Sequence, residues 1–282
     1  RNQLANTISY KKHAYKDLDA HKGWCLENRT LISRLEKVGT KLDHLYNTRT
    51  GIATLKNSVY IFQSIRDDED FYYLDKGIKI EKGICKDIVN SNKLVATNQI
   101  SNFIEKILFP YEYNRQNQVS VMSIEKIKNI YPYAYEYLLS NKKILAARDK
   151  GRGASYKYWY AFGRHQSLVR SKYKLLFPQL AKKGFQSYIS NNEELYFYNG
   201  MAVMSNTLEE LQILEKIFLS DVFWRYVSST SKHYAAGYYS LGKNYIKNFG
   251  ILNFSRQERD YLVSKHVPLS RLNDFINDRY LP

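Results

Sequence analysis

Apolar positions recur at helical spacing in several parts of this chain. The helical stretches are residues 31–38, 123–147 and 207–226, followed by two short amphipathic pieces, SRQERDYLVSKH and LSRLNDFIND. Pro132 restarts the second helix, and Thr207 with Glu210 predicts a capping box at the start of the third. One apolar stripe, which we interpret as core, consists of Leu211, Leu214, Ile217, Phe218, Val222, Phe223 and Tyr226.

Runs with alternating or continuous apolar residues predict strands between these helices. Two β-hairpins are expected, one in TGIATLKNSVYIF (50–62) around the polar LKNS, the other in 185–204 about Asn191 and Asn192. Further strands are expected in 78–95, 107–111 and 174–180, with DDED (67–70) as a loop. The chain therefore mixes helices and strands, and we find no internal repeat.

Composition indicates a globular protein, with 44% apolar and 25% charged residues among 282. We find neither a membrane-length apolar run nor a signal peptide, which predicts a cytoplasmic protein with no membrane partner. Cys25 and Cys85 lack metal-site spacing and are expected to be reduced thiols. Since the sequence starts at Arg1 without a methionine, we expect it to be a piece of a longer protein.

The net charge of +16 is distributed in blocks. Residues 142–183 hold twelve basic residues and one acid, Asp149, whereas 184–221 hold six acids and one base. Residues 222–248 then carry four bases and no acid. Codon bias would spread charge evenly, so the segregation favours a nucleic-acid surface over a merely solvated basic face.

The motifs of several enzyme classes are missing. No two prolines are adjacent, which removes the Asp/Asn-Pro-Pro-Tyr loop of amino-methylating enzymes. Gly151 and Gly153 form a lone GxG after a helix, the wrong context for a dinucleotide or S-adenosylmethionine turn. No acid is followed two residues later by Lys, GxSxG is absent, and the six histidines show no metal-site clustering. We interpret the chain as a binding part without a catalytic centre or metal of its own.

Specific runs of the sequence, in their order and spacing, carry a family resemblance. These are LEKVGTKLDHLYNTRTGIATLKNSVYIF (35–62), YPYAYEYLLSNKKILAARDKGRG (131–153), WYAFGRHQSL (159–168), KLLFPQLAKK (174–183), the YFYNG hairpin and SSTSKHYAAGYYSLGKNYIKNFGI (228–251). Together they resemble the TaqI-type C-terminal specificity domain, the target-recognition region of adenine-specific DNA methyltransferases of restriction-modification systems. The likeness covers most of residues 34–250.

The resemblance implies a fold, a partner and a division of the chain. The fold would be an α/β (α+β) target-recognition globule with mixed or antiparallel twisted strands, packed helices and a helical C-terminal tail. Residues 1–33 would be a linker from a missing catalytic region, 34–250 the recognition domain and 251–282 the tail. The partners would be double-stranded DNA and a covalently preceding methyltransferase domain. That domain, not this chain, would bind S-adenosylmethionine.

Recognition requires cations on phosphates and forked or amide side chains on base edges. The phosphate candidates are Lys150, Arg152, Lys182, Lys183, Lys232, Ser240, Lys243, Asn244 and Lys247. The base-reading candidates are Arg164 and Gln166 in GRHQS. In GYYSLGKNYIKN, which resembles the family's closing signature, we expect Ser240, Lys243 and Asn244 to face outward and Tyr238 or Tyr239 to pack inside.

Three alternatives stay open at this point. Half of a type I specificity subunit would have a similar domain, although its long heptad spacers are not visible. A general RNA- or single-strand-binding protein would use the tyrosines as stacking platforms. An intact methyltransferase would require motifs that we do not find. The sequence discloses neither the DNA word nor whether the parent protein also cleaves DNA.

Overall fold

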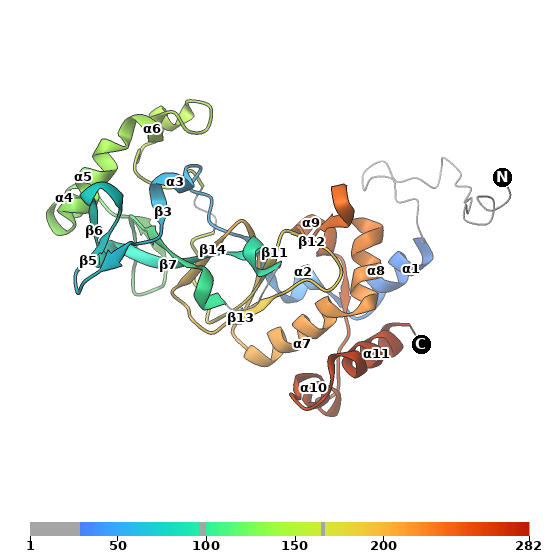
Figure 1. Cartoon of the computed structure of the whole chain (residues 1–282). Coiled ribbons are helices and arrows are strands. Elements are labelled where there is room, and N and C mark those ends of the chain that lie inside the picture. The colour runs from blue at the N-terminus through green and yellow to red at the C-terminus, as the bar shows by residue number, and fades with distance from the viewer. Residues whose placement is uncertain (1–28, 96–99, 165–166, 282) are drawn as a thin grey trace.

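The computed structural model describes residues 29–95, 100–164 and 167–281 (Figure 1). The α-helices are α1 (Arg29–Lys37), α2 (Leu42–Leu45), α3 (Asn57–Tyr60), α4 (Ile124–Ile130), α5 (Pro132–Ser140), α6 (Lys142–Ala146), α7 (Leu208–Leu219), α8 (Asp221–Thr230), α9 (Lys243–Ile246), α10 (Arg256–Val263) and α11 (Leu269–Tyr280). The 3-10 turns that matter below are η2 (Asp75–Gly77), η6 (Arg152–Ser155) and η7 (Ala235–Gly237).

The strands are short, and the longest have six residues. They are β1 (Thr40–Lys41), β2 (Asn47–Thr50), β3 (Ile61–Phe62), β4 (Arg66–Asp67), β5 (Phe71–Tyr73), β6 (Lys79–Glu81), β7 (Cys85–Asn90), β8 (Ile104–Leu108), β9 (Tyr111–Tyr113), β10 (Val119–Val121), β11 (Tyr173–Pro178), β12 (Leu180–Ala181), β13 (Tyr188–Ser190), β14 (Leu195–Tyr198), β15 (Gly200–Ser205), β16 (His233–Tyr234), β17 (Tyr238–Ser240) and β18 (Gly250–Ile251).

Two four-stranded sheets form the centre of the molecule. One has the order β13-β11-β15-β2 and is antiparallel, with Leu175 of β11 opposite Val203 of β15. The other has the order β14-β7-β8-β3 and joins a parallel pair, β14 with β7, to antiparallel pairs. The predicted α/β globule of mixed and antiparallel strands is confirmed.

Alternation along the central strands builds three hydrophobic cores, because successive side chains of a strand point to opposite faces. Phe197 of β14 and Leu176 of β11 belong to a cluster shared by the two central sheets. The residues that precede them, Tyr196 and Leu175, each belong to one of the other two cores. Each sheet therefore has one face on the shared cluster and the other on a core of its own.

The two outer cores define two lobes. The α4–α6 lobe packs these helices around buried residues such as Ile107, Leu138 and Phe162. The α7–α8 lobe packs α1, α7, α8, α10 and α11 around residues such as Leu214 and Phe223. In Figure 1 the α4–α6 lobe lies on the left and the α7–α8 lobe on the right, with the central sheets between them.

The helices of the α7–α8 lobe confirm the predicted apolar stripe, since every residue of it is buried. Ser220 divides the stripe between α7 and α8 and caps α8, its hydroxyl accepting from the backbone N–H of Phe223. The predicted C-terminal helices also form, as α10 and α11. Asn273 and Asn277 of α11 accept the backbone N–H groups of Asp221 and Val222, so α11 docks on the start of α8.

The two predicted hairpins are wrong. In 50–62, β2 pairs with β15, the residues around LKNS form α3, and β3 pairs with β8 in the other central sheet. In 185–204, β13 pairs with β11, whereas β14 pairs with the distant β7. In both stretches the polar break between apolar runs sends the chain from one sheet to the other.

The capping box is also misplaced in the prediction. Thr207 precedes α7 without a side-chain cap, and Glu210 instead accepts from the hydroxyl of Ser205 at 2.7 Å. A capping box does form at α10, between Ser255 and Glu258. Within the described residues, no helix combines the length and the apolar character that crossing a membrane would require.

Candidate nucleic-acid interface

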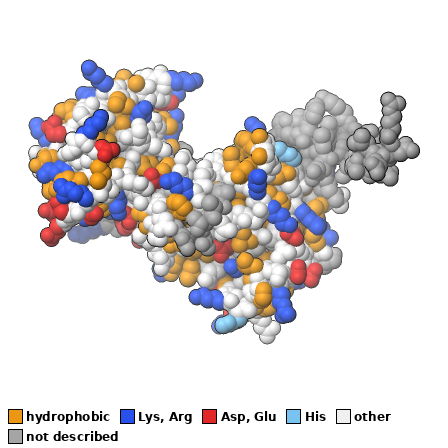
Figure 2. All heavy atoms as spheres, viewed as in Figure 1, with side chains coloured by type: hydrophobic (Ala, Val, Ile, Leu, Met, Phe, Trp, Pro, Cys, Tyr) orange, Lys and Arg blue, Asp and Glu red, His pale blue; other side chains and the backbone are white. Residues whose placement is uncertain are grey.

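An open hollow of about 470 Å³ lies where the two lobes meet. Residues 50–53 and 55–57 line one side of it, and Gln179, Asn199 and Gly200 line the other. Gln179 joins β11 to β12, and the backbone N–H of Leu241 donates to its carbonyl at 2.8 Å. In Figure 2 the upper outline of the molecule dips between its two halves. Figure 1, in the same view, shows α3 in one of these halves and β12 in the other.

The 50–57 wall is anchored to the central sheets by its backbone. The N–H of Gly51 donates to the carbonyl of Gly200 at 3.1 Å, and that of Ile52 to the carbonyl of Phe197 at 2.8 Å. A Cβ on Gly51 would lie 2.5 Å from the backbone of Tyr198, so this close approach requires glycine.

Two residues that line the hollow have unfavourable backbone conformations. Leu55 has φ 59° and Asn199 has φ 52°, the left-handed region that non-glycine residues seldom occupy. Leu55 is also an exposed large apolar side chain. Such strain is frequent at binding sites, where the surrounding structure has to hold it.

Buried Arg148 ties the 50–57 wall to residues 159–162. Its Nη1 donates to the carbonyl of Thr54 at 3.5 Å and to the hydroxyl of Tyr60 at 3.0 Å, and its Nη2 donates to the carbonyl of Trp159 at 2.9 Å. The Tyr60 hydroxyl in turn donates to the carbonyls of Tyr160 and Ala161. The chain then reaches Arg164, whose backbone N–H donates to the carbonyl of Ala53 at 3.1 Å. Arg164 therefore starts at the edge of the hollow.

Asp149 gathers two of the predicted DNA-binding cations. Its Oδ1 lies 2.9 Å from Nη2 of Arg152 and its Oδ2 lies 3.5 Å from Nη1 of Arg164. The hydroxyl of Tyr156 donates to Oδ2 at 2.9 Å, and this bond, with the two arginines, lowers the pKa of Asp149. The Asp149 carboxylate therefore holds both guanidinium groups in defined places on the surface.

On the other side of the hollow, strands β16 and β17 form an exposed hairpin beside β12. Register pairs Tyr234 with Tyr238 and His233 with Tyr239. Tyr239 packs inward against Trp224 of α8, with ring centroids 5.5 Å apart, as expected for one of the two tyrosines. The Nζ of Lys182 lies 4.8 Å from the ring centroid of Tyr238, and that of Lys232 lies 5.2 Å from that of Tyr234.

The remaining candidates from the sequence are less uniform. Lys150 and Asn244 are exposed, and Lys247 is half-buried at the end of α9. Lys183 and Lys243 each form an ion pair with a carboxylate: Lys183 with Asp221 at 2.7 Å, and Lys243 with Asp43 at 2.5 Å. Gln166 lies outside the described residues.

Ser240 does not face outward, which corrects the prediction that it contacts phosphate. Only 4% of it is exposed, because β12 runs beside it and pairs Leu180 with it. Its carbonyl accepts from the hydroxyl of Ser231 at 2.6 Å, and its own hydroxyl accepts from the backbone N–H of Gly242 at 3.2 Å. Ser240 thus supports the hairpin from within.

The structure brings the base-reading candidate Arg164 and the 50–57 wall together, and the sequence reasoning missed that wall. Lys56 and Asn57, in the polar LKNS, had been interpreted as the turn of a hairpin. Their polar character was visible, but their position next to Arg164 depends on hydrogen bonds such as that from the N–H of Gly163 to the carbonyl of Thr54, at 3.1 Å.

Among the residues of this interface that the structure describes, neither a metal centre nor a nucleotide-type glycine turn is found. The described residues contain no group of three or more His, Cys, Asp or Glu suited to a metal ion. Gly151 and Gly153 lie between α6 and the residues that follow η6, and a Cβ on Gly153 would lie 2.3 Å from the carbonyl oxygen of Leu145. Gly153 therefore serves tight packing after a helix.

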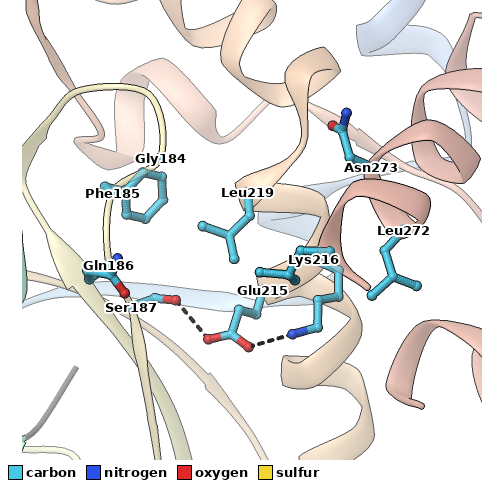
Figure 3. Close-up of a pocket in the computed structure, with 10 residues that line it drawn as sticks. Gly184, Phe185, Gln186, Ser187, Glu215, Lys216, Leu219, Leu272 and Asn273 are labelled. Carbon is cyan, nitrogen blue, oxygen red and sulfur yellow. Dashed lines mark hydrogen bonds and ion pairs between the residues drawn. The ribbon is translucent and has the colours of Figure 1, made fainter. Parts of the chain in front are cut away.

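A second pocket, of about 340 Å³, lies in the α7–α8 lobe (Figure 3). It is lined by residues 184–187 and by parts of α7 and α11. Its acid, Glu215, accepts from the hydroxyl of Ser187 at 2.8 Å and pairs with Lys216 at 3.3 Å. Its charged groups therefore satisfy one another, and it shares no lining residue with the hollow.

Comparison with known proteins places this fold. No protein-family model and no curated protein matches the sequence. Among solved structures the chain is similar to the type IIL restriction-modification enzyme MmeI in complex with DNA, with a TM-score of 0.52 and 9% identity. The match covers 85% of this chain and 32% of MmeI, so the chain spans about a third of that protein's length.

A further match is to the type IIG restriction endonuclease BpuSI, with a TM-score of 0.39 and 12% identity, covering 89% of this chain and 33% of that one. The similarity to MmeI is one of fold. A fold of this kind therefore occurs as part of a larger restriction-modification enzyme. The narrower resemblance to TaqI-type specificity domains stays a prediction.

Proposed function

We propose that this chain recognises a short sequence in double-stranded DNA. It would do so as the C-terminal specificity region of an adenine-specific, S-adenosylmethionine-dependent DNA methyltransferase or of a fused restriction-modification enzyme. The observation that supports this proposal most is that cations from two different lobes lie on the two sides of one open hollow. The fold shared with part of MmeI, a protein solved in complex with DNA, supports the same conclusion.

The distribution of charge supports duplex DNA as the ligand. Lys150, Arg152 and Arg164 lie on the α4–α6 side of the hollow, and Lys182 and Lys232 on the β12 and hairpin side. Cations on both sides of a concave surface suit a polyanion that crosses it, because each neutralised phosphate releases condensed counterions. Binding should therefore weaken steeply as the salt concentration rises.

Within this surface, Arg164 is the best candidate for reading a base. A guanidinium fork can donate to both O6 and N7 of guanine. The Nη1 of Arg164 now donates to Asp149, to the hydroxyl of Tyr156 and to the carbonyl of Gly163, so oxygen acceptors hold this nitrogen before DNA arrives. The carboxylate of Asp149 repels phosphate, which favours exchange of these acceptors for base-edge atoms over capture of the DNA backbone.

Chemistry on the target adenine would take place in the preceding catalytic domain. An amino group within the stack is inaccessible, so such enzymes extrude the base and read the surrounding sequence with another surface. We assign that second task to this chain, which would fix the register of the duplex while the catalytic domain holds the extruded base and S-adenosylmethionine.

The test is selection of randomised duplex DNA on this chain at near-physiological salt, with single-stranded DNA and RNA as competitors. The proposal predicts enrichment of a short word that contains adenine. Adding either competitor should reduce duplex binding only slightly. Binding that the competitors abolish, without an enriched word, would show a general RNA- or single-strand-binding protein instead. Absence of any binding would show that the charge serves solubility.

A further inference from the structure

The tip of the β16–β17 hairpin is apolar and exposed on a basic part of the molecule. It consists of Ala235, Ala236 and Gly237, all exposed, and the adjoining Tyr234 is 41% exposed. No acidic residue occurs between Val222 and Asn248. Figure 1 shows the chain between α8 and α9 at the upper edge of the right-hand lobe, the edge at which Figure 2 shows the dip.

The two faces of this hairpin differ in what they contact. On one face, the rings of His233 and Tyr239 lie with their centroids 4.6 Å apart, and Tyr239 packs on Trp224 of α8. On the other face, Tyr234 and Tyr238 are cross-strand neighbours, each with a lysine Nζ near its ring, Lys232 and Lys182 respectively. The packed face holds the hairpin in place, and the other presents rings and cations outward.

The backbone of the tip turns sharply at Ala236. Ala236 has φ 60° and ψ 25°, a left-handed conformation in which the Cβ of an L-residue is crowded and glycine is favoured. The exposed Ala236 methyl group adds little to the packing of the fold at this position. The turn therefore presents the Ala236 methyl group at the exposed end of the hairpin.

We propose that this hairpin enters the major groove of the bound duplex and reads thymine through its 5-methyl group. The inference rests on the proposed function and adds the groove, the element and the base. A two-stranded β-ribbon fits the major groove, where alanine is a partner for the thymine methyl group. Ala235 and Ala236 offer methyl groups and no side-chain hydrogen bond, so apolar contact is the only side-chain readout available to them.

The flanking lysines fit the same geometry. Lys182 and Lys232 lie behind the tip, where a ribbon inserted in the groove would bring them to the phosphates along its edges. Their tyrosine neighbours hold the ammonium groups by cation–π attraction, and within the described residues neither lysine has an ion pair that DNA would have to displace. A duplex bound in this way would contact the apolar tip with its bases and the two lysines with its phosphates.

Replacement of thymine by uracil provides the test, because it removes only the methyl group. Each thymine of a word enriched by selection is replaced in turn, and the dissociation constant is measured for the wild type, Ala235→Gly/Ala236→Gly and Lys76→Gly. Lys76 is a matched control: it has φ 61° and ψ 27° in η2, and glycine follows it as Gly237 follows Ala236. Both variants relieve the same backbone strain.

We expect at least one replacement to weaken wild-type binding about fourfold, the affinity that burying one methyl group provides. The double-glycine variant should lose this thymine preference and still bind the duplex, whereas Lys76→Gly should keep it. Equal binding of thymine and uracil duplexes by the wild type, or a preference that survives in the double-glycine variant, overturns the inference alone. Failure to select any duplex word overturns the proposed function and the inference with it.

Discussion

The two groups of cations beside the hollow are held in opposite ways. On the α4–α6 side, Arg152 and Arg164 share the Asp149 carboxylate, and buried Arg148 fixes the chain behind them. On the hairpin side, Lys182 and Lys232 lie near tyrosine rings in a stretch without acids. A cation that must leave a carboxylate gains less from phosphate than one that leaves only a ring. We therefore expect the first group to supply fixed geometry and the second to supply phosphate affinity.

The largest expected effect is on stability and concerns the α4–α6 side of the hollow. Arg148→Met should lower the free energy of unfolding by about 3 kcal/mol, because the carbonyl of Trp159 and the hydroxyl of Tyr60 lose a buried charged donor. Arg152→Met, at a side chain 68% exposed, should lower it by no more than about 1 kcal/mol. Urea denaturation measures both. Equal stability of the two variants would show that Arg148 does not hold this side together.

The next effect concerns phosphate affinity. Lys182→Ala/Lys232→Ala should weaken binding of an enriched duplex roughly 30-fold at 0.15 M salt and lower the log–log salt slope by about 1.8. Lys183→Ala/Lys243→Ala removes the same charge but from lysines paired with Asp221 and Asp43, and should change the slope much less. Titrations at several salt concentrations measure the slope. An equal decrease in both double variants would contradict the distinction between lysines held by tyrosine rings and lysines paired with carboxylates.

A smaller and more local effect is expected at Arg164. Arg164→Lys keeps the charge but loses the fork, and should reduce discrimination at one base position about tenfold while leaving the salt slope unchanged. Arg115→Lys, an exposed arginine in the loop after β9, should leave the selected word intact. Selection with each variant reports the word. A uniform loss at every position for Arg164→Lys would assign it to phosphate instead.

A last effect, on stability, separates surface cations from a buried one in the same basic block. Lys174 is 2% exposed, and burial lowers its pKa to about 8 from the usual lysine value of 10.5. Between these pH values the folded state binds fewer protons than the unfolded state, so the free energy of unfolding should rise with pH, by at most about 1.4 kcal/mol per unit.

A pair of variants tests this dependence. The stability advantage of the wild type over Lys174→Met should grow between pH 8 and 9.5 and should stay constant relative to Lys172→Met, at an exposed lysine two positions earlier. Neither variant should alter the word selected from duplex DNA. A flat difference for Lys174→Met would mean that this lysine stays protonated in its buried site.

The helices and the cations were predictable from the sequence, whereas the sheets and the hollow were only partly so. The stripe through Leu214 and Phe223 is a local pattern that identifies its own buried face. The partner of β14 is not local: Leu195 pairs with Asp87, and no turn residue encodes that choice. The polar residues at 191–192 indicated a reversal correctly but not the sheet that follows it.

The site shows the same limit. The charge blocks and the GRHQS run indicated Arg164, Lys182 and Lys232 as candidates, because both are visible in the sequence. It could not locate the wall at residues 50–57, which backbone hydrogen bonds to Gly200 and Phe197 create. Nor could it show that Ser240 is buried, since β12 covers it only after the chain has folded.

The most direct test of the account asks whether both groups of cations bind one duplex. Hydroxyl-radical footprinting of an enriched duplex would compare the wild type with Lys150→Ala/Arg152→Ala and Lys182→Ala/Lys232→Ala. The account predicts one continuous footprint, from which the two double variants lose protection in different segments. Loss of the same segment in both variants, or unchanged protection in either, would contradict a duplex held across the hollow by the two lobes.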